Sequence, residues 1–153
     1  MKNAVRKLTT ITLLLASFAA SAGVETATDA NDVILAGHDA VAYFTEKKAV
    51  LGRVQFTAQH DGAVYRFASA ENRDLFRANP DKYAPAYGGY CAFGTSLGKK
   101  FDVDGKAFEV VEGRLYVNKN LDVYKTWRKD IPGNIVKAEG HWAQIKDIAP
   151  SKL

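Results

Sequence analysis

Two short turn sequences, Asp61-Gly62 and Glu112-Gly113, constrain the fold most strongly, because apolar and polar residues alternate on both sides of each. A two-residue turn of type I′ needs positive φ at both central positions, which Asp-Gly tolerates well. Alternation with a period of two is typical of a strand that buries one face. The sequence therefore predicts two antiparallel β-hairpins, one around each turn.

The register of the first hairpin follows from counting outward from its turn, and the same count applies to the second. It pairs His60 with Ala63, Ala58 with Tyr65 and Phe56 with Phe67. This pairing gathers apolar side chains on one face: Phe56, Ala58, Tyr65 and Phe67 in the first hairpin, and Phe108, Val110, Leu115 and Val117 in the second.

Helices are predicted after each hairpin. Ser69 can cap a helix over residues 70–78, with Leu75 and Phe76 turned inward, and Pro80 ends it. These signals place a first helix directly after the first hairpin.

A second helix is expected to begin after Asn120 and to end at Pro132-Gly133. Residues 135–148 are expected to form a last short helix or ordered tail, whereas residues 84–106, which include Cys91, fit neither period. No internal repeat and no linker is evident. We therefore predict a small single α+β domain with two antiparallel hairpins and several short helices.

The first 22 residues have the three parts of a secretory signal peptide. These are a basic start, an apolar stretch from Leu8 to Phe18, and the small-x-small site Ala20-Ser21-Ala22. The apolar stretch is shorter than the roughly 20 residues that span a bilayer. We expect a signal peptide at 1–22, a flexible mature N-terminus at 23–31 and a domain at 32–148. The mature protein is then periplasmic or secreted, without a membrane anchor.

The basic charge belongs largely to that leader. The chain has 21 Lys and Arg against 17 Asp and Glu, and three of the basic residues, Lys2, Arg6 and Lys7, precede the expected cleavage site. The remainder is nearly balanced and shows no charge run. Nucleic acid is therefore not an expected partner.

Several motifs of this chain resemble the YHS-domain family. The signature covers Tyr65-Arg66-Phe67-Ala68-Ser69, Phe76 and Asn79-Pro80-Asp81-Lys82-Tyr83. Further segments are similar to an exported, signal-peptide-bearing subgroup of that family: residues 37–44, 88–92, 115–118 and 127–135. The resemblance runs from about Ile34 to Trp142, nearly the whole mature chain, and implies the family's fold.

Several YHS and related domains handle heavy metals through cysteine thiolates that follow the hairpin. The corresponding positions here are Ala68 and Asn72, neither of which is a soft ligand. Ala40 also stands where the exported subgroup often has proline. The resemblance therefore does not by itself transfer a metal site.

A different metal site is predicted from the chain's own residues. Cys91 and His38 could bind copper or zinc, with Asp39 as a further ligand or as an orienting group. The only cysteine has no partner for an internal disulfide, so its thiol is left for another use or for protection by burial. We expect an exported, non-enzymatic binding module with a site at His38, Asp39 and Cys91.

Other interpretations of these residues remain open. Cys91 could be a buried apolar thiol, and Gly37-His38-Asp39 could be a turn in which the aspartate binds backbone amides. Cys91 could also be the nucleophile of a thiol enzyme with His38 as its base. A third alternative is a protein-interaction domain that binds no metal. The crowded aromatic residues around Cys91 favour a core over a ligand pocket.

Overall fold

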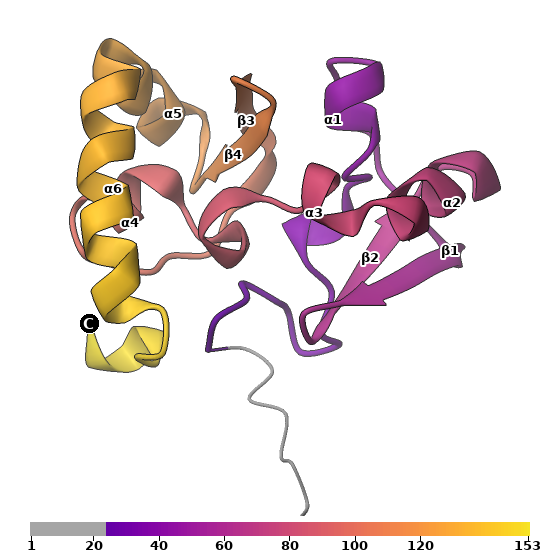
Figure 1. The fold of residues 1–153 in the computed structure, drawn as a ribbon, viewed down its shortest axis with the longest axis horizontal. Coiled ribbons are helices and arrows are strands. Elements are labelled where there is room, and N and C mark those ends of the chain that lie inside the picture. Colours follow the sequence, from indigo (N-terminus) through magenta and orange to yellow (C-terminus); the bar gives the residue numbers. More distant parts are fainter. Residues whose placement is uncertain (1–23) are drawn as a thin grey trace, which may run out of the picture.

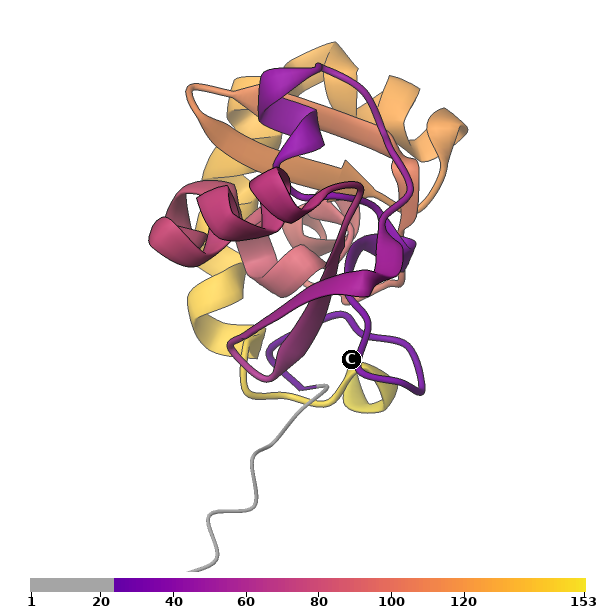
Figure 2. The same ribbon diagram turned by 90° about the vertical axis from the view of Figure 1, so that its right-hand side faces the viewer.

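The computed structural model describes residues 24–153, so the predicted signal peptide lies outside the described residues. Their elements form an α+β domain, as the sequence predicts, with two separate two-stranded antiparallel sheets. Figure 1 shows the elements in two groups, one around each hairpin, and Figure 2 looks onto the first group from its own side.

The first half begins with the 3-10 helix η1 (Leu35–Gly37) and the short helix α1 (Ala42–Thr45). The hairpin of β1 (Arg53–His60) and β2 (Ala63–Phe67) follows, and then α2 (Ala70–Ala78) and α3 (Pro80–Tyr83).

The second half has the same order of elements. It comprises η2 (Ala86–Gly89), α4 (Ala92–Ser96), β3 (Asp104–Val111), β4 (Arg114–Asn118), α5 (Leu121–Trp127), the 3-10 helix η3 (Arg128–Asp130), α6 (Ile131–Ile145) and the terminal 3-10 helix η4 (Pro150–Lys152).

Both predicted turns have the expected backbone. Asp61 and Gly62 have φ of 47° and 75°, and Glu112 and Gly113 have φ of 50° and 78°. His60 pairs with Ala63 and Ala58 with Tyr65, as predicted. The predicted pairing of Phe56 with Phe67 is wrong, because an irregularity in β1 leaves Phe67 opposite Arg53.

The second sheet lies between two hydrophobic cores. Leu115 and Val117 belong to a core that is otherwise built from the first half. Tyr116, on the opposite face of β4, packs with Trp127 and Ala138 in a second core. Both faces of β4 thus contribute buried side chains, because residues of α5 and α6 pack on the side of Tyr116.

The helix boundaries follow the caps. Ser69 and Asn120 accept hydrogen bonds from backbone amides at the starts of α2 and α5, as their sequence positions predict. Phe76 is buried, but Leu75 is exposed, contrary to prediction. Pro132-Gly133 does not end a helix either: it lies in the first turn of α6, where proline needs no amide donor.

The two halves are a structural repeat that the sequence analysis missed. Each position from β1 onward recurs 51 residues later, as Glu112 follows Asp61. Both first strands carry an irregularity at the same place, between Arg53 and Thr57 and between Asp104 and Phe108. The repeat preserves turns and caps while most side chains differ, which is why the sequence shows no evident periodicity.

The fully buried aromatic residues Phe76 and Trp127 are also 51 residues apart, one in each core. Upstream of the strands the spacing is 52 residues, as Cys91 follows Asp39, because the stretch from Asp39 to the start of β1 is one residue longer than the stretch from Cys91 to the start of β3. Parallel bridges join Val33 to Val64 and Pro85 to Leu115 at matching places.

Residues 24–31, predicted as flexible from their composition, have fixed contacts instead. Thr26 and Ala27 are buried, and the Ala27 amide donates to the Gly88 carbonyl at 2.8 Å. The ammonium of Lys100 donates to the carbonyls of Val24, Lys146 and Ile148 at 2.6, 2.6 and 2.9 Å. One buried lysine thus holds the first described residues against the C-terminal segment.

Candidate functional site

Asp39 is fully buried and has a structural role. Its carboxylate accepts hydrogen bonds from the amides of Val41 and Ala42 at 2.8 and 3.2 Å. It also accepts from the Ala68 amide and from Asn72 Nδ2, both at 2.8 Å. The carboxylate therefore fixes the start of α1 against the end of β2, as in the alternative interpretation in which the aspartate binds backbone amides.

His38 lies just before it and is 6% exposed. Its Nδ1 is 3.1 Å from the Leu35 carbonyl oxygen. A carbonyl oxygen only accepts hydrogen bonds, so Nδ1 is the donor in this contact and Nε2 takes no part in it. Within residues 24–153 no hydrogen bond or ion pair occupies that nitrogen.

Cys91 is 1% exposed and has no disulfide partner. Its Sγ caps α4 by accepting from the Gly94 amide at 3.3 Å. Asn118 Oδ1 lies 3.7 Å from the sulfur, on the acceptor side of a weak S–H hydrogen bond. The thiol therefore caps α4. Apart from the thioether of Met1, its sulfur is the only one in the sequence that could bind a metal ion.

The surroundings of Cys91 act on its acidity in opposite directions. Burial raises the pKa of the thiol above 9.0, and this effect is the largest. Hydrogen bonds from the amides of Gly94, Lys119 and Phe93, together with the charge of Lys119, lower it. The thiol is therefore protonated at neutral pH, yet amide donors surround the position where a thiolate charge would form.

The three predicted site residues have different partners. The His38 ring packs against the Cα of Gly105, and Asn118, beside the sulfur, pairs with Asp104 in the same sheet. His38 and Cys91 thus contact different residues of the second sheet, and no hydrogen bond joins them. Among the described residues, no group of three or more His, Cys, Asp or Glu side chains is placed to hold a metal ion.

Asp39 and Cys91 occupy equivalent places in the two halves. The Asp39 amide donates to the Val50 carbonyl, and the Cys91 amide donates to the Phe101 carbonyl. Each side chain accepts from the amide three residues ahead, and each also accepts from an amide just beyond the second strand of its hairpin. Sequence reasoning missed this relation, because the 52-residue spacing has a meaning only once the backbone hydrogen bonds are known.

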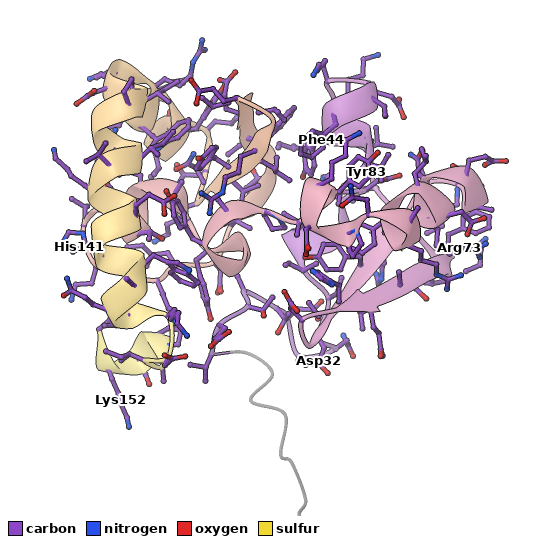
Figure 3. The ribbon with its side chains drawn as sticks, in the orientation of Figure 1. Asp32, Phe44, Arg73, Tyr83, His141 and Lys152 are labelled. Atoms are coloured by element: carbon purple, nitrogen blue, oxygen red, sulfur yellow. The ribbon has the colours of Figure 1, made fainter. Side chains whose placement is uncertain are left out.

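The remaining histidines have other partners or settings. His60 Nε2 lies 3.3 Å from carboxylate oxygens of both Asp61 and Asp81. His141, labelled on α6 in Figure 3, lies against Gly98, and its buried Nδ1 has no hydrogen-bond partner within residues 24–153.

The aromatic residues near Cys91 are core residues, as the sequence favours. Tyr87 and Tyr90 are buried, and both pack against Trp142. The centroid of the Trp142 ring lies 5.9 Å from that of Tyr87 and 6.3 Å from that of Tyr90. Tyr83 is buried in the first core and meets Phe44 edge-on, and Figure 3 labels this pair. These rings fill the interior instead of lining a ligand site.

Comparison with known proteins finds no matching family model, no matching curated protein and no matching solved structure. The resemblance to the YHS-domain family accordingly stays a prediction from the motifs. Along residues 24–153, no helix has both the length and the apolar character needed to cross a membrane.

Proposed function

We propose that the protein is an exported, non-enzymatic binding module that takes up one copper or zinc ion, with His38 and Cys91 as its ligands. The contact between the His38 ring and the Leu35 carbonyl carries this proposal. A ligating histidine commonly donates its second ring N–H to a backbone carbonyl, which fixes the ring and leaves the other nitrogen for the metal. The contact between Nδ1 and the Leu35 carbonyl has this form.

Cys91 would supply the soft ligand. A thiol gives up its proton when it binds a metal ion, so metal binding has to offset the burial that raises the pKa of Cys91. The amides of Gly94, Phe93 and Lys119 support the resulting negative charge. The donor set of one imidazole and one thiolate suits Cu and Zn.

Asp39 is better assigned to positioning than to ligation. Both of its oxygens already accept hydrogen bonds, and losing them would leave four buried donors unpaired. It holds the segment that follows His38.

Binding is favoured over thiol catalysis for a reason specific to Cys91. A nucleophilic cysteine usually has a lowered pKa and a base within hydrogen-bond reach. Burial raises the pKa of Cys91 instead, and its described partners are amides and Asn118, with no histidine among them. Alkylation of the native protein tests this: we expect a slow reaction at neutral pH, and a fast reaction well below pH 9 would favour the enzyme.

The exported location is proposed from the leader in the sequence. Its basic start, apolar stretch and small-x-small site support periplasmic or secreted placement after cleavage at Ala22. N-terminal sequencing of the protein from an exporting host tests this: Gly23 should be the first residue.

Metal titration tests the binding proposal. The purified protein should bind one equivalent of Zn²⁺, or of Cu⁺ under anaerobic conditions, in competition with a chromophoric chelator. His38→Gln and Cys91→Ser should each weaken binding at least about tenfold, as expected for loss of a ligand. His60→Gln is the matched control, because its ring is bound to two carboxylates elsewhere.

The variants separate the two ligands. Unchanged affinity in Cys91→Ser would remove the thiol from the site, and unchanged affinity in His38→Gln would remove the imidazole. Absence of binding by the wild-type protein would overturn the proposal as a whole. Circular dichroism of each variant checks that its fold is retained.

A further inference from the structure

The pocket around Asp39 shows what its counterpart around Cys91 is built to hold. Four donors converge on the Asp39 carboxylate: three backbone amides and the side-chain amide of Asn72. Two oxygens on one atom share these donors, so each donor has an acceptor. This arrangement is suited to a small, planar, two-oxygen anion.

The pocket around Cys91 has a similar set of donors and one acceptor fewer. The Gly94 amide donates to the sulfur at 3.3 Å, and hydrogen bonding from the Phe93 and Lys119 amides also lowers the pKa of the thiol. Val41, the counterpart of Phe93, donates to an Asp39 oxygen, whereas the Phe93 amide donates to Asn118 Oδ1 at 3.1 Å. The asparagine thus provides the oxygen that the cysteine side chain lacks.

Asn118 supplies an independent sign that this pocket is incomplete. It is fully buried, its Oδ1 lies 3.7 Å from the sulfur, and its Nδ2 has no hydrogen-bond partner within residues 24–153. A buried N–H₂ group without an acceptor destabilises the folded state. An anion with two oxygens at Cys91 could accept from the backbone amides and, after rotation of the carboxamide, from Nδ2 as well.

We propose that Cys91 is a peroxide oxidation site whose stable product is the sulfinate. The thiol loses its proton to solvent, and the sulfur attacks one oxygen of hydrogen peroxide. The O–O bond breaks, an S–O bond forms, and the other oxygen leaves as water, which gives the sulfenic acid. A second peroxide repeats the two-electron oxidation and gives the sulfinate, a proton and a second water.

The sulfinate has the charge and the two oxygens of the Asp39 carboxylate, and it occupies the equivalent position. Its second oxygen provides an acceptor for Asn118 Nδ2, which the thiol leaves unpaired among the described residues. A third oxygen has no counterpart in the Asp39 pocket, so oxidation is expected to stop before the sulfonate.

Access to the sulfur controls the rate. The Phe101 ring packs over α4 so closely that a Cβ on Gly94 would lie 2.6 Å from it, and Lys119 Nζ lies 5.0 Å from its centroid. Phe101 is 40% exposed, whereas Cys91 is 1% exposed. Oxidation therefore requires movement of this cover, and truncation in Phe101→Ala should accelerate it several-fold.

Mass spectrometry of the full chain treated with millimolar hydrogen peroxide in the presence of a chelator tests the proposal. The peptide that contains Cys91 should gain two oxygens, and the oxidised protein should unfold about 4 °C or more above the reduced protein. No oxidation, a product dominated by three oxygens, or a lower unfolding temperature after addition of two oxygens would each overturn it.

Two variants test the pocket. Cys91→Asp does so without peroxide, and Asn118→Ala does so through a second residue of the pocket. Cys91→Asp places a carboxylate there permanently and should unfold at a higher temperature than Cys91→Ser; the reverse order contradicts the proposal. In Asn118→Ala, oxidation of Cys91 should raise the unfolding temperature less than in the wild-type protein. An equal rise would remove Asn118 from the site. None of these readouts depends on metal binding.

Discussion

Gly105 lies directly against the imidazole of His38, so that a Cβ on this glycine would overlap Nδ1 and the neighbouring ring carbons. Gly105 also accepts a hydrogen bond from the Tyr43 hydroxyl through its carbonyl, at 2.7 Å. The absence of a side chain at position 105 therefore determines where the ring of residue 38 can lie.

Gly105→Ala should push the His38 ring away from Leu35 and destabilise the protein by about 1–3 kcal/mol. Urea unfolding measures the loss, and the Nδ1–H signal in NMR reports on the hydrogen bond. Gly140→Ala is the control: no atom lies within 4 Å of its added Cβ in α6, so helix propensity should make it neutral or stabilising. Equal effects of the two substitutions would contradict the contact.

Asp39→Asn should cost about 3 kcal/mol or more in the free energy of unfolding, because an amide cannot replace both oxygens for the four donors. Asn72→Ala removes only one of these hydrogen bonds and should cost less. Chemical denaturation compares the two variants. A smaller loss for Asp39→Asn than for Asn72→Ala would show that the carboxylate does not organise this region.

Lys100→Met should destabilise the protein by at least about 2 kcal/mol, because three carbonyl oxygens lose a charged donor. Hydrogen exchange should increase near Val24 and near Lys146 together. Lys99→Met, at an exposed neighbouring position, is the control and should leave both segments protected. Faster exchange at only one end would argue against a shared anchor.

Alkaline pH should unfold the protein through its buried tyrosines. Burial raises the pKa of Tyr65 above the ordinary value of 10.0, so the unfolded chain releases this proton first and stability falls as pH rises above about 10. Tyr65→Phe should lose about 1.4 kcal/mol less than the wild-type protein between neutral pH and about pH 11. Urea unfolding at the two pH values measures this difference; an identical loss in both proteins would contradict it.

The caps and turns made much of the fold predictable. The two glycine-containing turns place both hairpins correctly, and the caps Ser69 and Asn120 place the starts of α2 and α5 correctly. These signals are reliable because each acts within a few residues. The pairing of Phe56 failed because an irregularity in a strand has no local signature here. Pro132 was misread because proline fits the first turn of a helix as well as the residue after one.

The relation between Asp39 and Cys91 lay beyond sequence patterns for a chemical reason. A carboxylate and a thiol differ in charge, size and number of acceptors, so nothing in their identities suggests that they fill the same position. Only the backbone around them shows the equivalence, through matching hydrogen bonds to Val50 and Phe101. Asp39 and Cys91 could be chosen as candidates from the sequence. Their roles depend on hydrogen-bonding groups from distant segments, such as Asn72 for Asp39 and Asn118 for Cys91.

The lysine that joins both ends of the described chain also sets an order of assembly. Its three acceptors are Val24, Lys146 and Ile148, which lie at opposite ends of the domain in sequence. During synthesis the segment at Val24 leaves the ribosome long before its partners exist. The ammonium can have all three of its acceptors only after residues 146–148 have been made, so the link between the two ends of the described chain is completed only when synthesis is nearly finished.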